Sequence, residues 1–160
     1  MDLKSMLNKI IEGAPIWVSV GASDAELMEL VKRSLDLLAE GNYDLVFQQL
    51  GYALAFGEGA SAIRRAIESY RSPQFFPDVM EFHVTDWRSA SGGNPEPLAL
   101  VRRYSYSVSL PIVATIEIHL PLNGKWSDLE ADFVVMVKTA ADREGVLRLE
   151  DISAPRECDV

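Results

Sequence analysis

The stretch LPLNGKWSDLEADFVV, residues 120 to 135, places Asn123-Gly124 between two runs of alternating apolar and polar residues. Asn-Gly is the strongest short signal for a β-hairpin, because a type I′ turn needs positive φ at both central positions. With this turn, the predicted cross-strand pairs are Ile118 with Leu129, Ile116 with Ala131, Ala114 with Phe133, His119 with Asp128, Glu117 with Glu130 and Thr115 with Asp132. The first three pairs form an apolar face that we expect to pack on helices.

The opposite face of the predicted hairpin carries Glu117, His119, Asp128, Glu130 and Asp132. Directly opposed like charges destabilise a sheet by up to ~1 kcal/mol, so a Glu117–Glu130 pair needs an explanation. In one interpretation, water solvates this face and the charges discourage aggregation. In the other, the face is a recess or a partner surface where crowded carboxylates have raised pKa values and bind cations. A shift of the turn by one residue would exchange the two faces.

The first half of the chain shows helical periodicity, and the second half shows period-two patterns after Pro77. The predicted helices are 2–12, a helix of about 17 residues opened by the capping box Ser23-Glu26, a helix capped by Asn42, and ASAIRRAIESY at 60–70. The predicted strands are 81–88, 98–110, 112–120, 128–138 and 145–153, with SASGGNPEP at 89–97 as a flexible loop. Helices followed by consecutive antiparallel strands indicate an α+β fold, since parallel βαβ units would alternate the two.

Length and composition predict a single domain over 1–160, with 1–22 as an N-terminal extension and 154–160 as a tail. The 24 acidic and 15 basic residues give a net charge of −9, which disfavours nucleic-acid binding and favours a basic partner. The single cysteine, Cys158, excludes a disulfide framework. No window has the apolar run of a signal peptide or a membrane span, so we expect a cytoplasmic protein without a membrane partner.

No cofactor and no metal site are expected, because His83 and His119 lie in different predicted strands without a cysteine cluster or a known metal-binding motif. Ser127 lacks the sequence frame of a catalytic nucleophile. The triplet Trp126-Ser127-Asp128 is instead expected to hold the hairpin end, with Trp126 covering Pro121 and Ser127 or Asp128 bonding nearby backbone N–H groups.

The stretches LLAEGNYDLVFQQL and FGEGASAIRRAIESY, followed by long antiparallel strands, resemble the SnoaL-like, nuclear transport factor 2-like superfamily. LAEGNYDLV and LPLNGKWSDLEADFVV…LRLEDIS also resemble a family of bacterial domains of unknown function. The resemblance spans roughly residues 24 to 153. It implies three N-terminal helices over a strongly curved antiparallel sheet, a cystatin-like cone with a cavity inside. It also implies a bacterial protein and a homodimer, because this fold often pairs through its sheet.

Enzymes of this superfamily, such as the ketosteroid isomerases and scytalone dehydratase, place a carboxylate or histidine base and a tyrosine donor in the cone. No catalytic residue is carried over, and the candidates for a ligand pocket are Tyr43, Tyr70, His83, Asp86, Tyr104 and Tyr106. The favoured function is a non-catalytic module that binds a basic protein partner, as an immunity or accessory protein would, or a small apolar ligand. The alternative is a small isomerase, dehydratase or cyclase, which needs an acid or base inside the cone.

Overall fold

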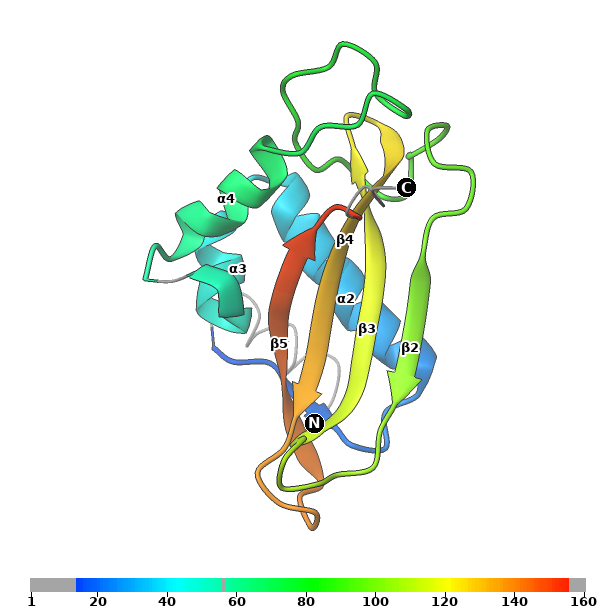
Figure 1. Ribbon diagram of the computed structural model, residues 1–160. Coiled ribbons are helices and arrows are strands. Elements are labelled where there is room, and N and C mark those ends of the chain that lie inside the picture. The colour runs from blue at the N-terminus through cyan, green and yellow to red at the C-terminus, as the bar shows by residue number, and fades with distance from the viewer. Residues whose placement is uncertain (1–13, 56, 156–160) are drawn as a thin grey trace.

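The computed structural model describes residues 14–55 and 57–155. Over these residues the chain is an α+β fold, with three helices on a curled, five-stranded antiparallel sheet of the cystatin-like cone type (Figure 1). The helices are α2 (Asp24–Ala39), α3 (Tyr43–Leu50) and α4 (Ala60–Glu68), with a 3-10 turn η1 at Ala53–Ala55. The strands are β1 (Trp17–Ser19), β2 (Ala99–Arg103), β3 (Ile112–Leu122), β4 (Lys125–Met136) and β5 (Glu144–Ser153), in the sheet order β1-β5-β4-β3-β2. The predicted helix over 2–12 lies outside the described residues.

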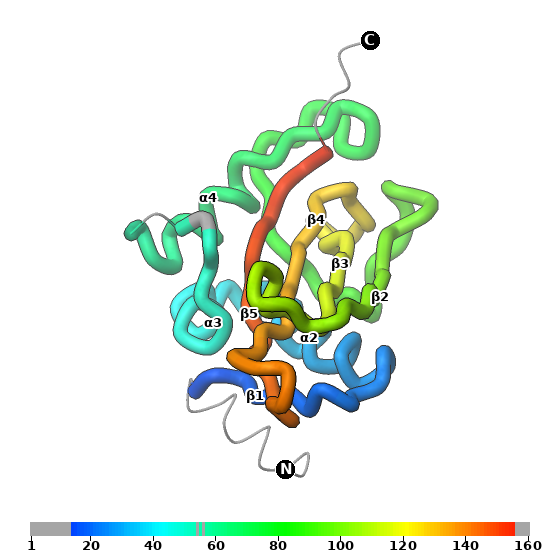
Figure 2. Tube along the Cα trace, turned by 60° about the horizontal axis from the view of Figure 1, so that its bottom comes forward, coloured from blue at the N-terminus to red at the C-terminus, as the bar shows by residue number. Residues whose placement is uncertain are grey.

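Both predicted helix caps are confirmed. The Ser23 hydroxyl accepts from the Glu26 N–H at 3.1 Å, and the Glu26 carboxylate accepts from the Ser23 N–H at 3.3 Å. Asn42 caps α3 by accepting from the Leu45 N–H at 3.3 Å. These bonds satisfy N–H groups that have no partner inside the helix. In Figure 1, α2 crosses behind β2 and β3, while α3 and α4 lie beside β5; Figure 2 shows the same division after rotation.

The Asn123-Gly124 turn is confirmed, with φ of 52° and 83° at its two residues. The predicted pairs beyond it are wrong, because one residue of β3 but three of β4 lie between the pairs Pro121–Trp126 and His119–Glu130. This bulge shifts the register by two residues. The observed pairs are Ile118–Ala131, Ile116–Phe133, Ala114–Val135, His119–Glu130, Glu117–Asp132 and Thr115–Val134. A shift of two keeps every side chain on its predicted face, so the apolar and polar faces are as predicted.

Ser127 holds the bulge in place. Its side chain is fully buried, and its hydroxyl donates to the Leu120 carbonyl at 2.6 Å and accepts from the Leu129 N–H at 3.1 Å. These bonds supply the partners that the bulged backbone would otherwise lack. The prediction that Ser127 binds nearby backbone at the hairpin end is therefore confirmed, and Trp126 is paired with Pro121 as the turn requires.

The predicted strand over 81–88 is wrong. Only Val84 joins the sheet, through an isolated bridge to Leu122. The segment is instead held by the hairpin turn, since the Asn123 side chain accepts from the His83 N–H at 3.1 Å. A side chain that bonds the backbone in this way competes with the ladder of a regular strand.

The predicted strand over 98–110 is too long. Strand β2 ends at Arg103, and the chain then turns, with Ser107 and Leu110 exchanging two backbone hydrogen bonds of 3.2 and 3.1 Å. Pro111, which has no N–H to offer a ladder, follows this turn. The alternation of apolar and polar residues continues past the real strand end, so it misplaces the boundary.

The loop over 89–97, predicted to be flexible, is tied to the hairpin. The Gly92 carbonyl accepts from the Trp126 N–H at 3.1 Å, and the Asn94 N–H donates to the Trp126 carbonyl at 2.8 Å. Three residues of the predicted N-terminal extension also join the sheet, because β1 pairs with β5 along Trp17–Val146. The sheet is therefore extended at one edge and braced at the hairpin end.

The interior of the cone is filled by its own side chains. Between the helices and the apolar face of β3 and β4 there are large residues with under 2% exposure. They include Leu27, Leu35, Leu38, Leu50, Ile63, Ile67, Ile116, Leu120, Leu129, Phe133 and Leu147. Within residues 14–55 and 57–155, no helix has the length and apolar character needed to cross a membrane.

Gly93 is expected to be essential where the loop meets the hairpin. Its φ is +75°, and a Cβ there would lie 2.2 Å from the Trp126 carbonyl oxygen. Gly92 has the same φ of +75°, but a Cβ there would meet nothing within 4 Å. Both alanine variants strain the backbone and only one clashes, so we expect Gly93→Ala to lower the free energy of unfolding by about 3 kcal/mol and Gly92→Ala by about 1 kcal/mol. Urea unfolding measures the stability of both variants. Equal losses of stability would contradict the close approach of Gly93 to the Trp126 carbonyl.

Candidate functional site

The side of the sheet without helices carries carboxylates on three adjacent strands. Glu117 of β3 is directly opposite Asp132 of β4, which is directly opposite Asp151 of β5. Glu130 lies two residues before Asp132 on β4, so the two side chains share a face. We name these four residues the acidic row. Figure 1 views the sheet from the side opposite α2, which passes behind β2 and β3.

The acidic row is only partly solvated. The Glu117 side chain is 27% exposed, and Arg102 is its ion-pair partner, with Nε 3.6 Å from Oε2. Asp132 and Asp151 are half-buried, and one oxygen of each is fully buried without a hydrogen-bond donor. Within the described part of the chain, no other ion pair reaches the row. The row therefore has more negative charge and more acceptors than its surroundings balance.

Crowding shifts the protonation of the row. The pKa of Asp132 is raised to about 8, chiefly because the side chain is partly buried. Hydrogen bonding with Glu130 and the charges of Glu130, Asp151 and Glu117 raise this pKa further. Burial and the neighbouring negative charges therefore both favour the protonated form of Asp132.

We expect Asp132→Asn to stabilise the fold at high pH. The folded chain keeps the Asp132 proton until about pH 8, whereas the ordinary pKa is 3.8, so stability present below pH 3.8 is lost as the pH rises to about 8. Asparagine cannot ionise, so the variant should gain about 1 kcal/mol at pH 8 after allowance for solvent screening, and nothing at pH 4. Urea unfolding at both pH values tests this, with the exposed Glu81→Gln as control. A variant less stable than the parent at pH 8 contradicts the argument.

His119, directly opposite Glu130, is held by the loop rather than free to pair with the row. Its Nδ1 accepts from the Leu98 N–H at 2.7 Å, and Asn94 Nδ2 lies 3.1 Å from the same atom. A backbone N–H can only donate, so Nδ1 carries no proton and the neutral ring is protonated on Nε2. Burial lowers the pKa of His119 despite the opposing charges of Glu130 and Asp128. His119 therefore serves as a neutral anchor of the loop.

Asp128, another predicted member of the partner surface, bonds to Tyr70. The Tyr70 hydroxyl donates to the Asp128 carboxylate, and the Tyr70 ring is only 4% exposed. The ring packs edge-on against Phe76 and Phe82, with centroid distances of 6.1 and 5.0 Å. Burial, followed by the hydrogen bond to Asp128, raises the pKa of Tyr70 to about 12. The bulge in β4 thus brings a carboxylate into contact with a buried phenol.

The bond between Tyr70 and Asp128 should stabilise the fold measurably. Tyr70→Phe keeps the ring in its aromatic contacts and removes only the donor, so we expect a loss of about 1 to 2 kcal/mol in the free energy of unfolding. Tyr104→Phe is the matched control, because Tyr104 is 38% exposed and its hydroxyl has no hydrogen bond among the described residues. Thermal unfolding compares the two variants. If Tyr70→Phe is as stable as Tyr104→Phe, the hydrogen bond to Asp128 does not stabilise the fold.

The six candidates for a ligand pocket do not converge. Tyr70 lies in the aromatic cluster just described. Tyr43 begins α3 under the Arg64 guanidinium, 5.4 Å from its ring centroid, and the pKa of Tyr43 is raised mainly by burial. The other four lie apart from both: His83 and Asp86 are exposed near the hairpin turn, Tyr104 follows β2, and Tyr106 donates to the Lys138 carbonyl at 3.2 Å.

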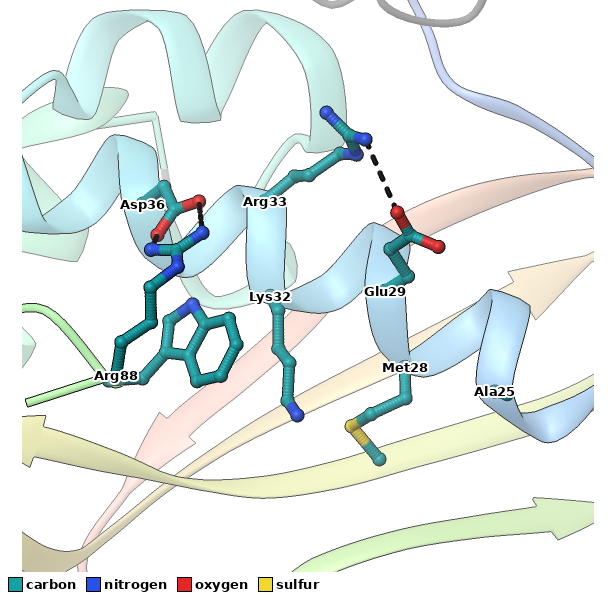
Figure 3. Close-up of a pocket in the computed structure, with 8 residues that line it drawn as sticks. Ala25, Met28, Glu29, Lys32, Arg33, Asp36 and Arg88 are labelled. Atoms are coloured by element: carbon teal, nitrogen blue, oxygen red, sulfur yellow. Dashed lines mark hydrogen bonds and ion pairs between the residues drawn. The ribbon is translucent and has the colours of Figure 1, made fainter. Parts of the chain in front are cut away.

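Three of the surface grooves among the described residues lie away from these candidates. One of about 590 Å³ lies between α2 and Trp87-Arg88 (Figure 3). Others of about 350 and 550 Å³ lie beside Tyr52 and beside Trp17. None of the six pocket candidates lines these three grooves. Across the described residues, no group of three or more His, Cys, Asp or Glu side chains is arranged to hold a metal ion.

Sequence reasoning missed two features of the surface. Asp151 lies in the predicted strand 145–153, but the sequence pattern does not indicate which residues of another strand pair with it. The Asp151 side chain therefore cannot be assigned to a face from sequence, and the observed pairing with Asp132 places it in the acidic row. The groove at Trp87-Arg88 joins α2 to a segment some 50 positions later, held by Arg88–Asp36 bonds of 2.8 and 3.0 Å. Oppositely charged residues far apart in the chain gave no signal that they would pair.

Comparisons with known proteins find no match, whether against protein-family models, curated proteins or solved structures. The functional argument therefore rests on the geometry of this chain: a filled cone, an acidic row on the side of the sheet without helices, and a groove along α2.

Proposed function

We propose that this protein is a non-catalytic binding module whose acidic row receives a basic protein partner, as in an immunity or accessory protein. The observation that carries this proposal is the direct opposition of Glu117, Asp132 and Asp151 across three strands. When the carboxylates are ionised, each such opposition destabilises the sheet by up to ~1 kcal/mol. Cations placed between these carboxylates would remove that repulsion, and this relief favours the binding of a basic partner.

The unpaired oxygens of the row indicate which cation fits. Asp132 and Asp151 each have a buried oxygen without a donor. An arginine guanidinium offers five N–H donors in a planar fork and suits neighbouring carboxylates better than a lysine ammonium does. An arginine side chain between Asp132 and Asp151 would supply both missing donors, with a small adjustment of these half-buried carboxylates.

The charge of the whole chain supports the same partner. A net charge of −9 attracts a basic protein from a distance and raises the rate of encounter. The raised pKa of Asp132 adds a pH dependence, because a bound cation favours the ionised carboxylate and expels its proton. Binding of a cation should thus tighten as the pH rises toward 8 and weaken as salt is added.

Other partners fit the geometry less well. A homodimer formed through this side of the sheet would set two acidic rows against each other, and like charges oppose that contact. A small apolar ligand inside the cone would have to displace core side chains such as Ile116 and Phe133, which are at most 1% exposed. We place the interaction with a basic protein in the bacterial cytoplasm, following the sequence and the resemblance.

An isomerase, dehydratase or cyclase is the second candidate function, and one observation favours it. The contact between Tyr70 and Asp128 joins a phenol and a carboxylate, the pair of groups that such chemistry uses. However, the Tyr70 ring is packed against Phe76 and Phe82, and neither Tyr70 nor Asp128 lines any of the three grooves. Binding through the acidic row therefore has the stronger support.

The proposal can be tested with an octa-arginine peptide as the probe. The test variant combines Glu117→Gln, Asp132→Asn and Asp151→Asn. The control combines Glu40→Gln, Asp44→Asn and Glu81→Gln, which are exposed elsewhere and give the same net charge. Because only the first set removes the opposed carboxylates, we expect it to weaken binding at least tenfold at 50 mM salt and the control less than threefold.

Isothermal titration calorimetry measures both variants at 50 and 200 mM salt and at pH 6 and 8. The parent chain should bind more tightly at pH 8 than at pH 6, and the test variant should lose that difference. If both triple variants bind the peptide equally, attraction comes from net charge alone and the acidic row is not the site. Circular dichroism confirms that each variant is folded.

A further inference from the structure

The groove along α2 has a different chemistry from the acidic row. It has a volume of about 590 Å³ and is walled by the side of α2 that faces away from the core and by Trp87-Arg88. It lies along α2, the helix behind the sheet in Figure 1, whereas the acidic row belongs to β3, β4 and β5. In Figure 3, Met28 and Lys32 extend from the same side of α2, while Arg33 and Glu29 turn to another and pair with each other.

The acidic and basic side chains around the groove are equal in number, but one cation among them has no ion-pair partner in the described part of the chain. Asp36 accepts from the Arg88 guanidinium through both oxygens, at 2.8 and 3.0 Å, and Asp86 accepts from the same guanidinium at 3.1 Å. Glu29 is 3.3 Å from Arg33. Lys32 belongs to none of the ion pairs formed by the described residues. Lys32 is therefore the cation of this groove that can pair with a bound anion.

Trp87 forms the aromatic wall beside that charge. Lys32 Nζ and Arg88 Cζ each lie 4.4 Å from the centroid of the Trp87 ring. The ring stabilises both cations, and the bidentate bond from Arg88 to Asp36 fixes the segment that carries it. The indole Nε1 of Trp87 and Nε of Arg33 are buried donors without an acceptor. The groove thus offers a cation without an ion-pair partner among the described residues, beside an aromatic ring.

We propose that this groove binds a small molecule with a flat apolar ring and a single carboxylate. The carboxylate pairs with Lys32, and the ring lies along Trp87 and Met28. The volume is in the range of small-ligand sites, which combine an apolar wall with a few polar groups. A ligand with one negative charge fits better than a polyanion, because Glu29 and Asp36 repel any charge beyond the one that Lys32 balances.

The test uses 2-naphthoate as the probe and the neutral 2-naphthamide as its matched analogue. Binding is followed by the indole N–H signal of Trp87 in ¹H–¹⁵N NMR spectra, assigned by its loss in Trp87→Phe. We expect 2-naphthoate to shift this signal in a saturable way and to bind at least tenfold more tightly than the amide, because only the acid can pair with Lys32.

Two lysine variants distinguish binding in the groove from attraction by the net charge of the protein. Lys32→Gln should weaken 2-naphthoate at least fivefold and leave the amide unchanged, whereas the exposed Lys125→Gln makes the same charge change and should leave both unchanged. Three outcomes would overturn the proposal: no shift of the Trp87 signal, equal binding of acid and amide, or Lys32→Gln binding the acid as the parent does. None of these outcomes bears on octa-arginine binding, so this site and the acidic row are tested separately.

Discussion

The pairing of β3 with β4 is the constraint on which the rest of the structure depends. The Asn123-Gly124 turn sets the two longest strands side by side, and their alternation sends one row of apolar side chains toward the helices. Ile116 and Phe133, paired directly, form the centre of the buried face. Helix α2 can cover this face because its capped, amphipathic sequence presents a matching apolar side. Burial of that face fixes which side chains remain outside.

The same constraint creates the acidic row. Once Ile116 and Phe133 face the core, period two forces Glu117 and Asp132 to the other side, directly opposite each other. Strand β5 then adds Asp151 to the line. A sheet selected only for stability would separate these carboxylates, and their opposition is the observation from which the binding of a basic partner is proposed. The energy of the buried face is what allows the sheet to tolerate it.

Two parts of the surface therefore differ in chemistry and in the elements that hold them. The acidic row is held by regular strands, where each carboxylate is positioned by the ladder. The groove on α2 depends on Arg88, whose bonds to Asp36 hold Trp87 beside Lys32. Sites on strands are more rigid than sites on loops, and a bidentate ion pair compensates in part for the lack of a ladder at Trp87. The filled cone between them offers no shared chamber.

The sequence by itself determined the fold class, the helix caps, the turn at Asn123-Gly124 and the two faces of the hairpin, because these depend on contacts between residues close in the chain. It did not determine the exact partners of Glu117, since the bulge at Ser127 arises from bonds that only the folded hairpin makes. Nor could it place Asp151 in the acidic row or Trp87 beside Lys32. Those contacts join separate elements, and local patterns of hydrophobicity carry no information about register or about side chains that meet across the fold.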